Sequence, residues 1–379
     1  MRLLFFNEGN LGTYILGQGQ LDAALRSGLR QAPDVTARFV DLGPMGRWSS
    51  ALASRPLWPL SAIDLNMSSL RWHAVQSART KIKLARELRQ WPADVVHLHS
   101  QSVALLMAGT RGLPPLALSV DATIRQWSEM PAWAPSARRA LIDIGSARIL
   151  ERRALRRATL VIAWTDWARH GVERDAPGAS VIAHHPGVDL ARLIPAARAP
   201  RQLPRVLFVG SRFVEKGGQD LLDAMGESLG DTAELDIVTP TAQIEERPGL
   251  RVHRLAPGDP GLLELQQQAD LFCLPTHGDT NPWVLLEAMA CQTPVISTQV
   301  GAIPEVLDDG NAGMLVPHAQ PRALRQALDR LLADPGERAA LATNGRLRCL
   351  SHYDAVRQFA TLVERFRALA TESPGIAHG

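Results

Sequence analysis

The chain has 379 residues, of which 46% are hydrophobic and 21% are charged; this composition excludes a disordered protein, and the length suits two domains. Residues 1–190 carry 23 Lys and Arg against 15 Asp and Glu, whereas the rest carry 18 against 23, so the first half either meets an anionic partner or has solvated arginines. The three cysteines are too widely spaced for a disulfide framework or a metal site, so a reducing cytoplasm is the expected location. The N-terminal apolar run is too short for a signal peptide or a membrane span.

Nine short apolar runs predict buried strands. Continuous apolar runs, in place of an alternating pattern, indicate that both faces of the sheet are covered. The runs lie at 2–6, 94–99, 114–120, 159–164, 205–210, 234–238, 270–275, 294–298 and 314–317.

Segments with apolar residues at helical spacing predict helices between these strands. Strand–helix–strand repetition with right-handed crossovers predicts parallel sheets in a doubly wound α/β fold. The helical segments are 18–31, 75–91, 139–157, 218–228, 282–291 and 321–333. In the second of them, one face is expected to be buried, made of Val75, Ala78, Ile82, Ala85 and Leu88.

A break in the pattern at 195–204 predicts a boundary between two domains. Its sequence, PAARAPRQLP, is rich in Pro, Ala and Arg, and a new series of strands and helices follows it. We therefore expect one Rossmann-like domain over 1–196 and a second over 197–351.

The loop after the strand at 205–210 carries two cations. Gly210 permits a tight turn, and a helix is expected to start near Gly218. Ligands of open parallel sheets bind beyond the carboxyl ends of the strands, so Arg212 and Lys216 predict a phosphate site, unless they are only solvated surface cations. The glycine spacing fits neither a P-loop nor a dinucleotide fingerprint, which disfavours ATP hydrolysis and NAD chemistry.

The segment after the strand at 270–275 carries a second candidate site. Asn281 suits the N-cap of a helix and Pro282 its first position, which leaves the backbone N–H groups of Trp283 and Val284 as an anion site. Glu287 lies one turn further on, in an apolar stretch. A carboxylate there needs a partner: the hydroxyls of a ribose, or a backbone N–H or an arginine in the core.

Two glycine-containing loops also follow predicted strands. In the loop at 7–19, Gly9 and Gly12 would let the backbone approach a ligand closely. In the loop that starts at 298, we expect Gly301 to loosen the chain, and the helix dipole explains Glu305 without a functional role.

These residues together resemble a GT-B glycosyltransferase of retaining family four, the glycosyl transferases group 1. The resemblance is carried by VGSRFVEKG, ADLFCLP, LLEAMACQTPVIST and VGAIPEVLDDGNAGMLVP in the second half, and by ADVVHLHS in the first. It implies two Rossmann-like domains that face a central cleft. It also implies that a helix over about 352–372 packs back on the first domain.

The resemblance implies roles for these residues. Arg212 and Lys216 would hold the donor diphosphate and stabilise it as it leaves. Glu287 would be the second acid of the family's signature of two glutamates and would bind the donor ribose, with Asn281, Trp283 and Val284 also on the donor. Gly12 and its neighbours would close on the donor from the first domain.

Three positions depart from the family pattern. Asp279 stands in place of the first glutamate, which contacts the transferred sugar. Thr280, Asn281 and Pro282 replace a Gly-aromatic-Gly sequence, and Asp121 occupies the place where the family often has a histidine. The resemblance therefore implies catalytic roles for Asp279, Asp121, Arg212 and Lys216, and leaves open an inactive or binding-only relative.

The implied reaction moves a sugar from a UDP- or GDP-sugar to a carbohydrate or lipid-linked acceptor, with retention of configuration. No cofactor is expected, because the nucleotide sugar is a substrate, and the lack of an Asp-x-Asp sequence or clustered His and Cys disfavours a metal. A sugar-nucleotide epimerase remains an alternative, whereas a phosphorylase would need Lys216, the only lysine of the second half, for pyridoxal phosphate.

Two basic stretches suggest peripheral contact with an anionic membrane at its inner face. The helix at 70–91 has six cations against Glu87 alone, and a further five arginines lie between 148 and 157. A nucleic-acid partner is not expected, because no reader motif is present.

Overall fold

The structure is a computed structural model that describes residues 1–7, 29, 32–58, 60, 67–226, 229–240, 243–256 and 258–372. The chain divides into two compact units. Unit 1 comprises Met1–Glu129, Trp133–Pro186 and Val356–Gly379, and unit 2 comprises Met130–Ala132 and Gly187–Ala355. Gly9, Gly12 and nearly all of the predicted helix at 18–31 lie outside the described residues.

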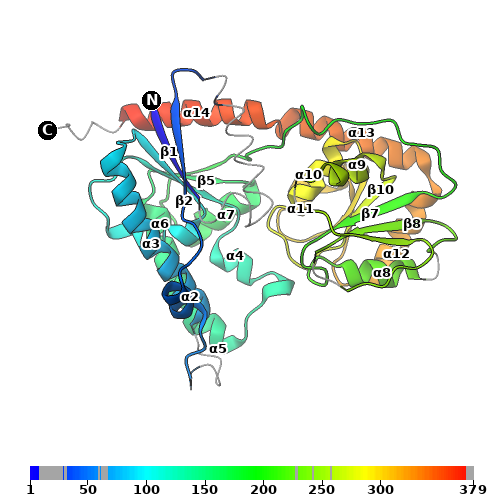
Figure 1. Ribbon diagram of the computed structural model, residues 1–379, viewed down its shortest axis with the longest axis horizontal. Coiled ribbons are helices and arrows are strands. Elements are labelled where there is room, and N and C mark those ends of the chain that lie inside the picture. Colours follow the sequence, from blue (N-terminus) through cyan, green and yellow to red (C-terminus); the bar gives the residue numbers. More distant parts are fainter. Residues whose placement is uncertain are drawn as a thin grey trace. The chain divides into compact units, whose positions relative to one another are not determined.

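Unit 1 contains a six-stranded sheet that is parallel throughout, in the order β2-β1-β3-β4-β5-β6 (Figure 1). Its strands are β1 (Arg2–Asn7), β2 (Thr36–Asp41), β3 (Val95–His99), β4 (Leu116–Val120), β5 (Leu160–Ala163) and β6 (Val181–Ala183). Four of them confirm predicted strands. The two that were not predicted, β2 and β6, form the edges of the sheet, where burial is incomplete and no long apolar run is needed.

The helices of unit 1 are interrupted more often than their sequence pattern indicates. The predicted helix at 139–157 is divided into three consecutive pieces, the middle one a π-helical turn. The α- and π-helices of unit 1 are α2 (Arg47–Ser54), α3 (Ser68–Gln90), α4 (Ile124–Ser128), α5 (Ala137–Arg139), η5 (Ala140–Ile144), α6 (Gly145–Arg157), α7 (Asp166–Asp175) and α14 (Ala355–Glu372). Short 3-10 turns of unit 1 are η2 (Gln101–Val103) and η3 (Met107–Gly109), whereas η4 (Pro131–Trp133) has its first two residues in unit 2.

Both faces of the unit 1 sheet are covered. On one face, alternate strand residues such as Leu98 pack in a core cluster with Leu84 of α3 and Val172 of α7. On the other face, the ring of Phe366 in α14 lies 6.1 Å from that of Phe5 and 5.7 Å from that of His97, measured between centroids. This two-sided burial is the reason the strands read as continuous apolar runs.

The buried face of α3 differs from the expected one. Ile82 is 74% exposed and Ala85 is also exposed. Polar side chains occupy the packed face because they find partners there: Ser77 Oγ, for example, accepts a hydrogen bond from the backbone N–H of Leu106 at 2.7 Å. The buried residues of α3 are Gln76, Ser77, Thr80 and Leu84.

Unit 2 contains a second parallel six-stranded sheet, in the order β12-β11-β10-β7-β8-β9. Its strands are β7 (Arg205–Val209), β8 (Glu234–Val238), β9 (Leu250–His253), β10 (Leu271–Leu274), β11 (Val295–Thr298) and β12 (Met314–Val316). All but the edge strand β9 confirm predictions. The strand order reverses between β7 and β10, because the chain runs outward from β7 to β9 and then continues on the other side of β7.

Three helices of unit 2, α8 (Gly218–Met225), α10 (Trp283–Ala290) and α12 (Pro321–Ala333), match predicted segments to within a few residues. The other helical elements of this unit are α9 (Pro260–Gln268), α11 (Ile303–Val306), η7 (Asp308–Gly310) and α13 (Pro335–His352). In α10, seven of the eight residues are buried. Within the described part of the chain, no helix is both long and apolar enough to cross a membrane.

Two α/β units with fully parallel sheets confirm the predicted doubly wound fold class. Apart from Met130–Ala132, which cluster with unit 2, the chain passes between the units after Pro186 and after Ala355, and the boundaries expected from the sequence lay at 196/197 and 351/352. The three cysteines, Cys273, Cys291 and Cys349, are buried thiols.

One buried carboxyl group supports the start of α4. Glu151 of α6 is buried, and its Oε1 accepts a hydrogen bond from the backbone N–H of Ile124 at 2.8 Å. Burial raises the pKa of Glu151 to about 8, since the charged form loses its water, and the hydrogen bond from Ile124 opposes this only in part.

The raised pKa of Glu151 predicts that stability falls as pH rises. The unfolded chain releases this proton near pH 4.5, whereas the folded protein keeps it up to about pH 8. The contribution of Glu151 to the unfolding free energy is therefore lost as pH rises across that window. Glu151→Gln removes this titration, and its stability relative to the wild type should increase across the window by on the order of 1 kcal/mol per pH unit. Denaturant unfolding at both ends of the window measures the difference, and a constant difference would contradict the assignment.

Candidate functional site

The reversal of strand order in unit 2 fixes where a ligand site can form. In an open parallel sheet, ligands bind beyond the carboxyl ends of the two strands at which the order reverses. Here these strands are β7 and β10, which pair directly although far apart in sequence. The loops that follow them, 210–217 and 275–282, contain Arg212, Lys216 and Asp279.

Lys216 and Asp279 form an ion pair at this position. The Lys216 ammonium donates to Asp279 Oδ2 and, at 3.2 Å, to the carbonyl oxygen of Gly278. Their side chains are 19% and 14% exposed, so the pair is largely shielded from water. An ammonium group has three donors, which leaves one N–H to reach a ligand oxygen above the strand ends.

Backbone contacts hold the two loops together around this pair. The N–H of His277 donates to the carbonyl oxygen of Glu215 at 2.9 Å. Gly217 has a φ of +76°, and a Cβ added there would lie 1.9 Å from the carbonyl oxygen of Pro275. Only glycine allows the loop after β7 to approach the loop after β10 this closely.

A third loop, after β11, fixes the backbone of Asp279. Gly301 has a φ of +59°, and a Cβ added there would lie 2.0 Å from the carbonyl oxygen of Asp279. The N–H of Ala302 donates to the carbonyl oxygen of Thr280 at 3.2 Å. Gly301 was expected to loosen this loop, but its structural role is a close approach that restricts it.

Arg212 is held less firmly than Lys216. Its side chain is 59% exposed, and its Nε lies 3.4 Å from Glu215 Oε2, three residues further along the same loop. An exposed ion pair of this kind contributes little to stability, so little free energy opposes a shift of the guanidinium towards an anionic ligand.

The start of α10 lies one residue later than expected. Pro282 is the N-cap and not the first helical residue, because its ψ of 105° is extended. Asn281 therefore precedes the cap and is buried, and no side-chain hydrogen bond caps the helix. Trp283 and Val284 occupy the first two helical positions, where a backbone N–H has no acceptor within its own helix.

Glu287 is buried in α10 beneath this helix end. Gln266 of α9 donates its side-chain N–H to Glu287 Oε2 at 2.8 Å. Burial raises the pKa of Glu287 to about 7, more than the hydrogen bond from Gln266 lowers it. The carboxyl group therefore changes its charge near neutral pH.

Unit 1 has its own reversal of strand order, between β1 and β3, and a histidine that the sequence analysis missed lies there. His99 ends β3 and is buried against Trp164, with ring centroids 5.1 Å apart. Burial lowers the pKa of His99 to about 4, and its Nδ1 has no hydrogen-bond partner within the described residues. The signal was in the sequence: a histidine that ends a predicted strand, in ADVVHLHS.

Asp121 follows β4 in a loop whose next two residues are held by hydrogen bonds to other segments. Gln101 donates its side-chain N–H to the carbonyl oxygen of Ala122 at 2.6 Å, and the hydroxyl of Thr123 donates to Asp175 Oδ2 at 2.7 Å. Asp121 belongs to unit 1, whereas Lys216 and the other donor-side residues belong to unit 2. The remaining predicted site residue, Gly12, lies outside the described residues.

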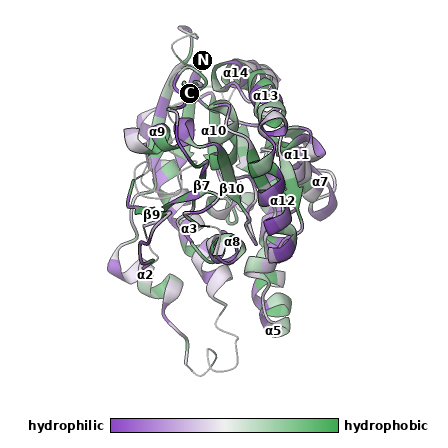
Figure 2. Cartoon of the chain, turned by 90° about the vertical axis from the view of Figure 1, so that its right-hand side faces the viewer, coloured by the Kyte–Doolittle hydropathy of each residue, from purple (hydrophilic) through white to green (hydrophobic). Residues whose placement is uncertain are grey.

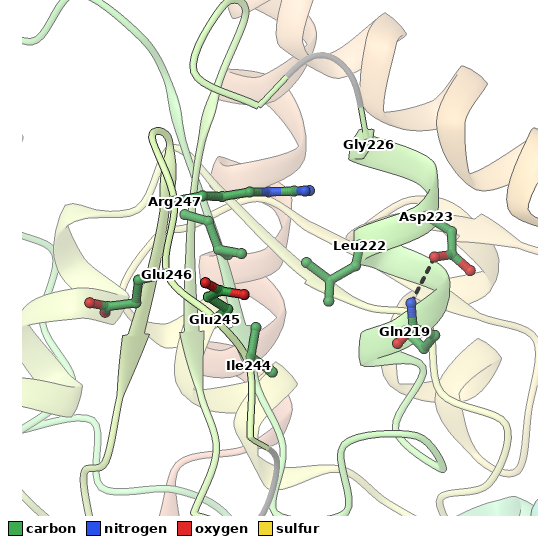
Figure 3. Close-up of a pocket in the computed structure, with 9 residues that line it drawn as sticks. Gln219, Leu222, Asp223, Gly226, Ile244, Glu245, Glu246 and Arg247 are labelled. Carbon is green, nitrogen blue, oxygen red and sulfur yellow. Dashed lines mark hydrogen bonds between the residues drawn. The ribbon is translucent and has the colours of Figure 1, made fainter.

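A pocket of about 570 Å³ also lies in unit 2, between α8 and the segment 244–250 (Figure 3). Asp223, Glu245 and Glu246 are among the residues that line it, and none of the predicted site residues is. Three carboxylates against the single guanidinium of Arg247 give this lining a net negative charge, which would repel a diphosphate, so the strand ends of β7 and β10 are the better candidate site. Among the described residues, no group of three His, Cys, Asp or Glu side chains is placed to hold a metal ion.

Comparisons with known proteins find similarity to glycosyltransferases. Residues 203–334, which include Arg212, Lys216, Asp279 and Glu287, match the family model described as glycosyl transferases group 1. The D-inositol 3-phosphate glycosyltransferase of Corynebacterium urealyticum is 28% identical over 62% of this chain and 63% of its own. The chain thus spans less than two thirds of that relative's length.

Solved structures of glycosyltransferases share the fold. The sucrose-phosphate synthase of Thermosynechococcus elongatus is 16% identical, with a TM-score of 0.79 over 98% of this chain and 100% of that one. An Anabaena protein solved in complex with UDP is 14% identical, with a TM-score of 0.67 over 97% of this chain and 100% of that one. Residues 203–334 thus resemble the glycosyl transferases group 1 family, and the whole chain shares the two-unit α/β fold of these solved structures.

Proposed function

We propose that the protein is a retaining glycosyltransferase that moves a sugar from a nucleoside-diphosphate donor to an acceptor. The observation that carries this proposal is the Lys216–Asp279 pair at the switch point of the unit 2 sheet. The pair lies within the stretch that matches the family model.

In this proposal, unit 2 binds the donor and stabilises its leaving group. The bond from the sugar to the diphosphate breaks with negative charge developing on the phosphate oxygens. Lys216, Arg212 and the start of α10 supply positive charge and N–H donors to these phosphate oxygens. Asp279 orients Lys216 and contacts the transferred sugar, and Glu287 accepts hydrogen bonds from the donor ribose.

Retention needs no covalent intermediate here. The acceptor hydroxyl attacks from the face that the diphosphate leaves, and its proton passes to a departing phosphate oxygen. Asp121 and His99, at strand ends of unit 1, are the proposed contacts of that unit with the reacting sugars. Neutral His99 can donate or accept a hydrogen bond with a sugar hydroxyl.

The substrates are proposed from the relatives. UDP is the proposed nucleotide, supported by the Anabaena protein in complex with UDP. A phosphorylated polyol or sugar is the proposed acceptor class, supported by the names of the inositol-phosphate and sucrose-phosphate enzymes.

An activity assay tests these substrates. The protein is incubated with UDP- and GDP-sugars and with phosphorylated, lipid-linked and polysaccharide acceptors, in the presence of a chelator, which tests the donor, the acceptor and the proposed metal independence. The coupling constant of the new anomeric proton tests retention.

We also propose that the protein works in the cytoplasm at the surface of an anionic membrane. Its three buried thiols are compatible with a reducing compartment. The uneven charge of the sequence supports an anionic contact.

The second candidate is a relative that binds the donor without transfer. The departures at Asp121, Asp279 and Pro282 favour it. Donor binding by calorimetry without transfer or hydrolysis would support this candidate, and release of UDP and an altered sugar without an acceptor would indicate an epimerase.

Replacing Lys216 tests the phosphate assignment. Lys216→Ala is expected to reduce kcat by about a hundredfold or more, since it removes a donor that acts on the leaving group. Arg251→Ala is the matched control, because Arg251 is a paired cation on an outer strand of the same sheet and should keep wild-type turnover. A Lys216→Ala variant with the turnover of the control would refute the assignment.

The pKa of Glu287 predicts a pH dependence of donor binding. A carboxylate accepts hydrogen bonds from ribose hydroxyls better than a carboxylic acid does, so affinity for a UDP-sugar should rise as pH increases through about 7. Glu287→Gln should bind more weakly at high pH and lose this dependence. Calorimetry with a UDP-sugar is the measurement, because its diphosphate does not titrate near pH 7. A wild-type profile that is flat, or that the variant reproduces, would exclude the ribose role.

A further inference from the structure

Several cations of the two basic stretches are used within unit 1. Arg79 donates to the carbonyl oxygens of Gly43 at 3.0 Å and Pro44 at 2.8 Å, and Lys83 donates to that of Asp41. Arg156 donates to the carbonyl oxygen of Pro177 at 2.8 Å. These side chains fasten loops to helices, so they are not available to bind lipid phosphate.

A different surface of unit 1 exposes large apolar side chains. Trp48 is 90% exposed, Trp58 81% and Leu141 78%. Trp48 and Leu52 are four residues apart in α2 and therefore share a helix face. We call this surface the tip; its exposed apolar residues are Trp48, Leu52, Leu57, Trp58, Leu60, Leu141 and Ile142.

The two segments of the tip are joined through the start of α3. Asp143 of η5 accepts hydrogen bonds from the backbone N–H groups of Ser69 and Leu70, at 3.0 and 2.7 Å. The guanidinium of Arg71, the next residue, donates to the carbonyl oxygen of Arg55 at 2.8 Å, just after α2. Figures 1 and 2 both show α2 and α5 at the same end of unit 1.

The charge of the tip has one sign. The segments 43–60 and 131–142 contain no Asp or Glu, whereas Arg47 and Arg55 are exposed in the first of them. The nearest acid in sequence, Asp143, is buried and bonded to α3. The tip thus combines exposed tryptophans, aliphatic side chains and arginines without a compensating exposed carboxylate in these segments.

We propose that the tip docks on an anionic phospholipid bilayer. Tryptophan rings favour the headgroup region, where the ring is partly apolar and its N–H meets water or phosphate. Leu52 and Leu141 would enter the acyl boundary, and Arg47 and Arg55 would contact lipid phosphates. The charge complementarity favours a lipid surface over a second copy of this tip, which would bring like charges together. This inference locates the membrane contact of the proposed function and does not depend on the catalytic roles.

Sedimentation of the full chain with vesicles tests the proposal. Vesicles of phosphatidylcholine with a third phosphatidylglycerol should retain the protein, and added salt should weaken this binding. Trp48→Ala/Trp58→Ala should reduce binding about tenfold or more, since the removed rings are the largest exposed apolar groups. Leu347→Ala is the matched control, because Leu347 is also exposed but lies in α13 of unit 2. Melting temperatures of all variants should equal that of the wild type, since these side chains are exposed.

Several results would overturn the proposal. These are no wild-type binding to anionic vesicles, equal binding to pure phosphatidylcholine, and equal binding by the tip variant. A dimer that the tip variant dissolves, without a change in vesicle binding, would assign the tip to a second copy instead. Turnover with a water-soluble acceptor is measured in parallel, so that failure of docking and failure of catalysis are distinguished.

Discussion

The contact between the Lys216 ammonium and the Asp279 carboxylate depends on the pairing of β7 with β10. More than 60 residues separate the two side chains in sequence, and only the reversal of strand order brings their loops together. Taking two charges out of water is costly unless geometry and further hydrogen bonds compensate. The carbonyl oxygen of Gly278 provides one such bond to Lys216, and Gly217 and Gly301 allow the close backbone contacts that fix the geometry.

This arrangement gives the pair a property that a solvated pair lacks. In water, two opposite charges at contact interact by about 1 kcal/mol, and the attraction grows as water is excluded. A diphosphate that reaches Lys216 therefore meets a charge that is already oriented and needs little rearrangement, which is the condition for electrostatic stabilisation of a leaving group. In the proposed reaction, the exposed Arg212 would complement it, because little opposes a shift of its guanidinium towards the phosphate oxygens as the bond breaks.

Sequence patterns predicted the strands well where burial on both sides leaves a continuous apolar run, as in β3 and β10. They missed β2, β6 and β9, because edge strands need no such run. They placed the buried face of α3 wrongly, since Ser77 and Thr80 are buried through hydrogen bonds that the sequence does not show. Lys216 and Asp279 were each predicted as site residues, but their mutual contact required knowledge of which strands are neighbours.

Charge in the sequence is likewise a poor guide to charge at the surface. Arg79 and Lys83 belong to the most basic stretch, yet their side chains end on backbone carbonyl groups, where they satisfy acceptors that the loops leave without a secondary-structure partner. Arg47 and Arg55 lie in a segment that is less basic but has no acid, and both are exposed beside Trp48 and Trp58. The difference lies in what surrounds each cation: a guanidinium used by the fold cannot also bind lipid phosphate, whereas one beside exposed tryptophans remains available for it.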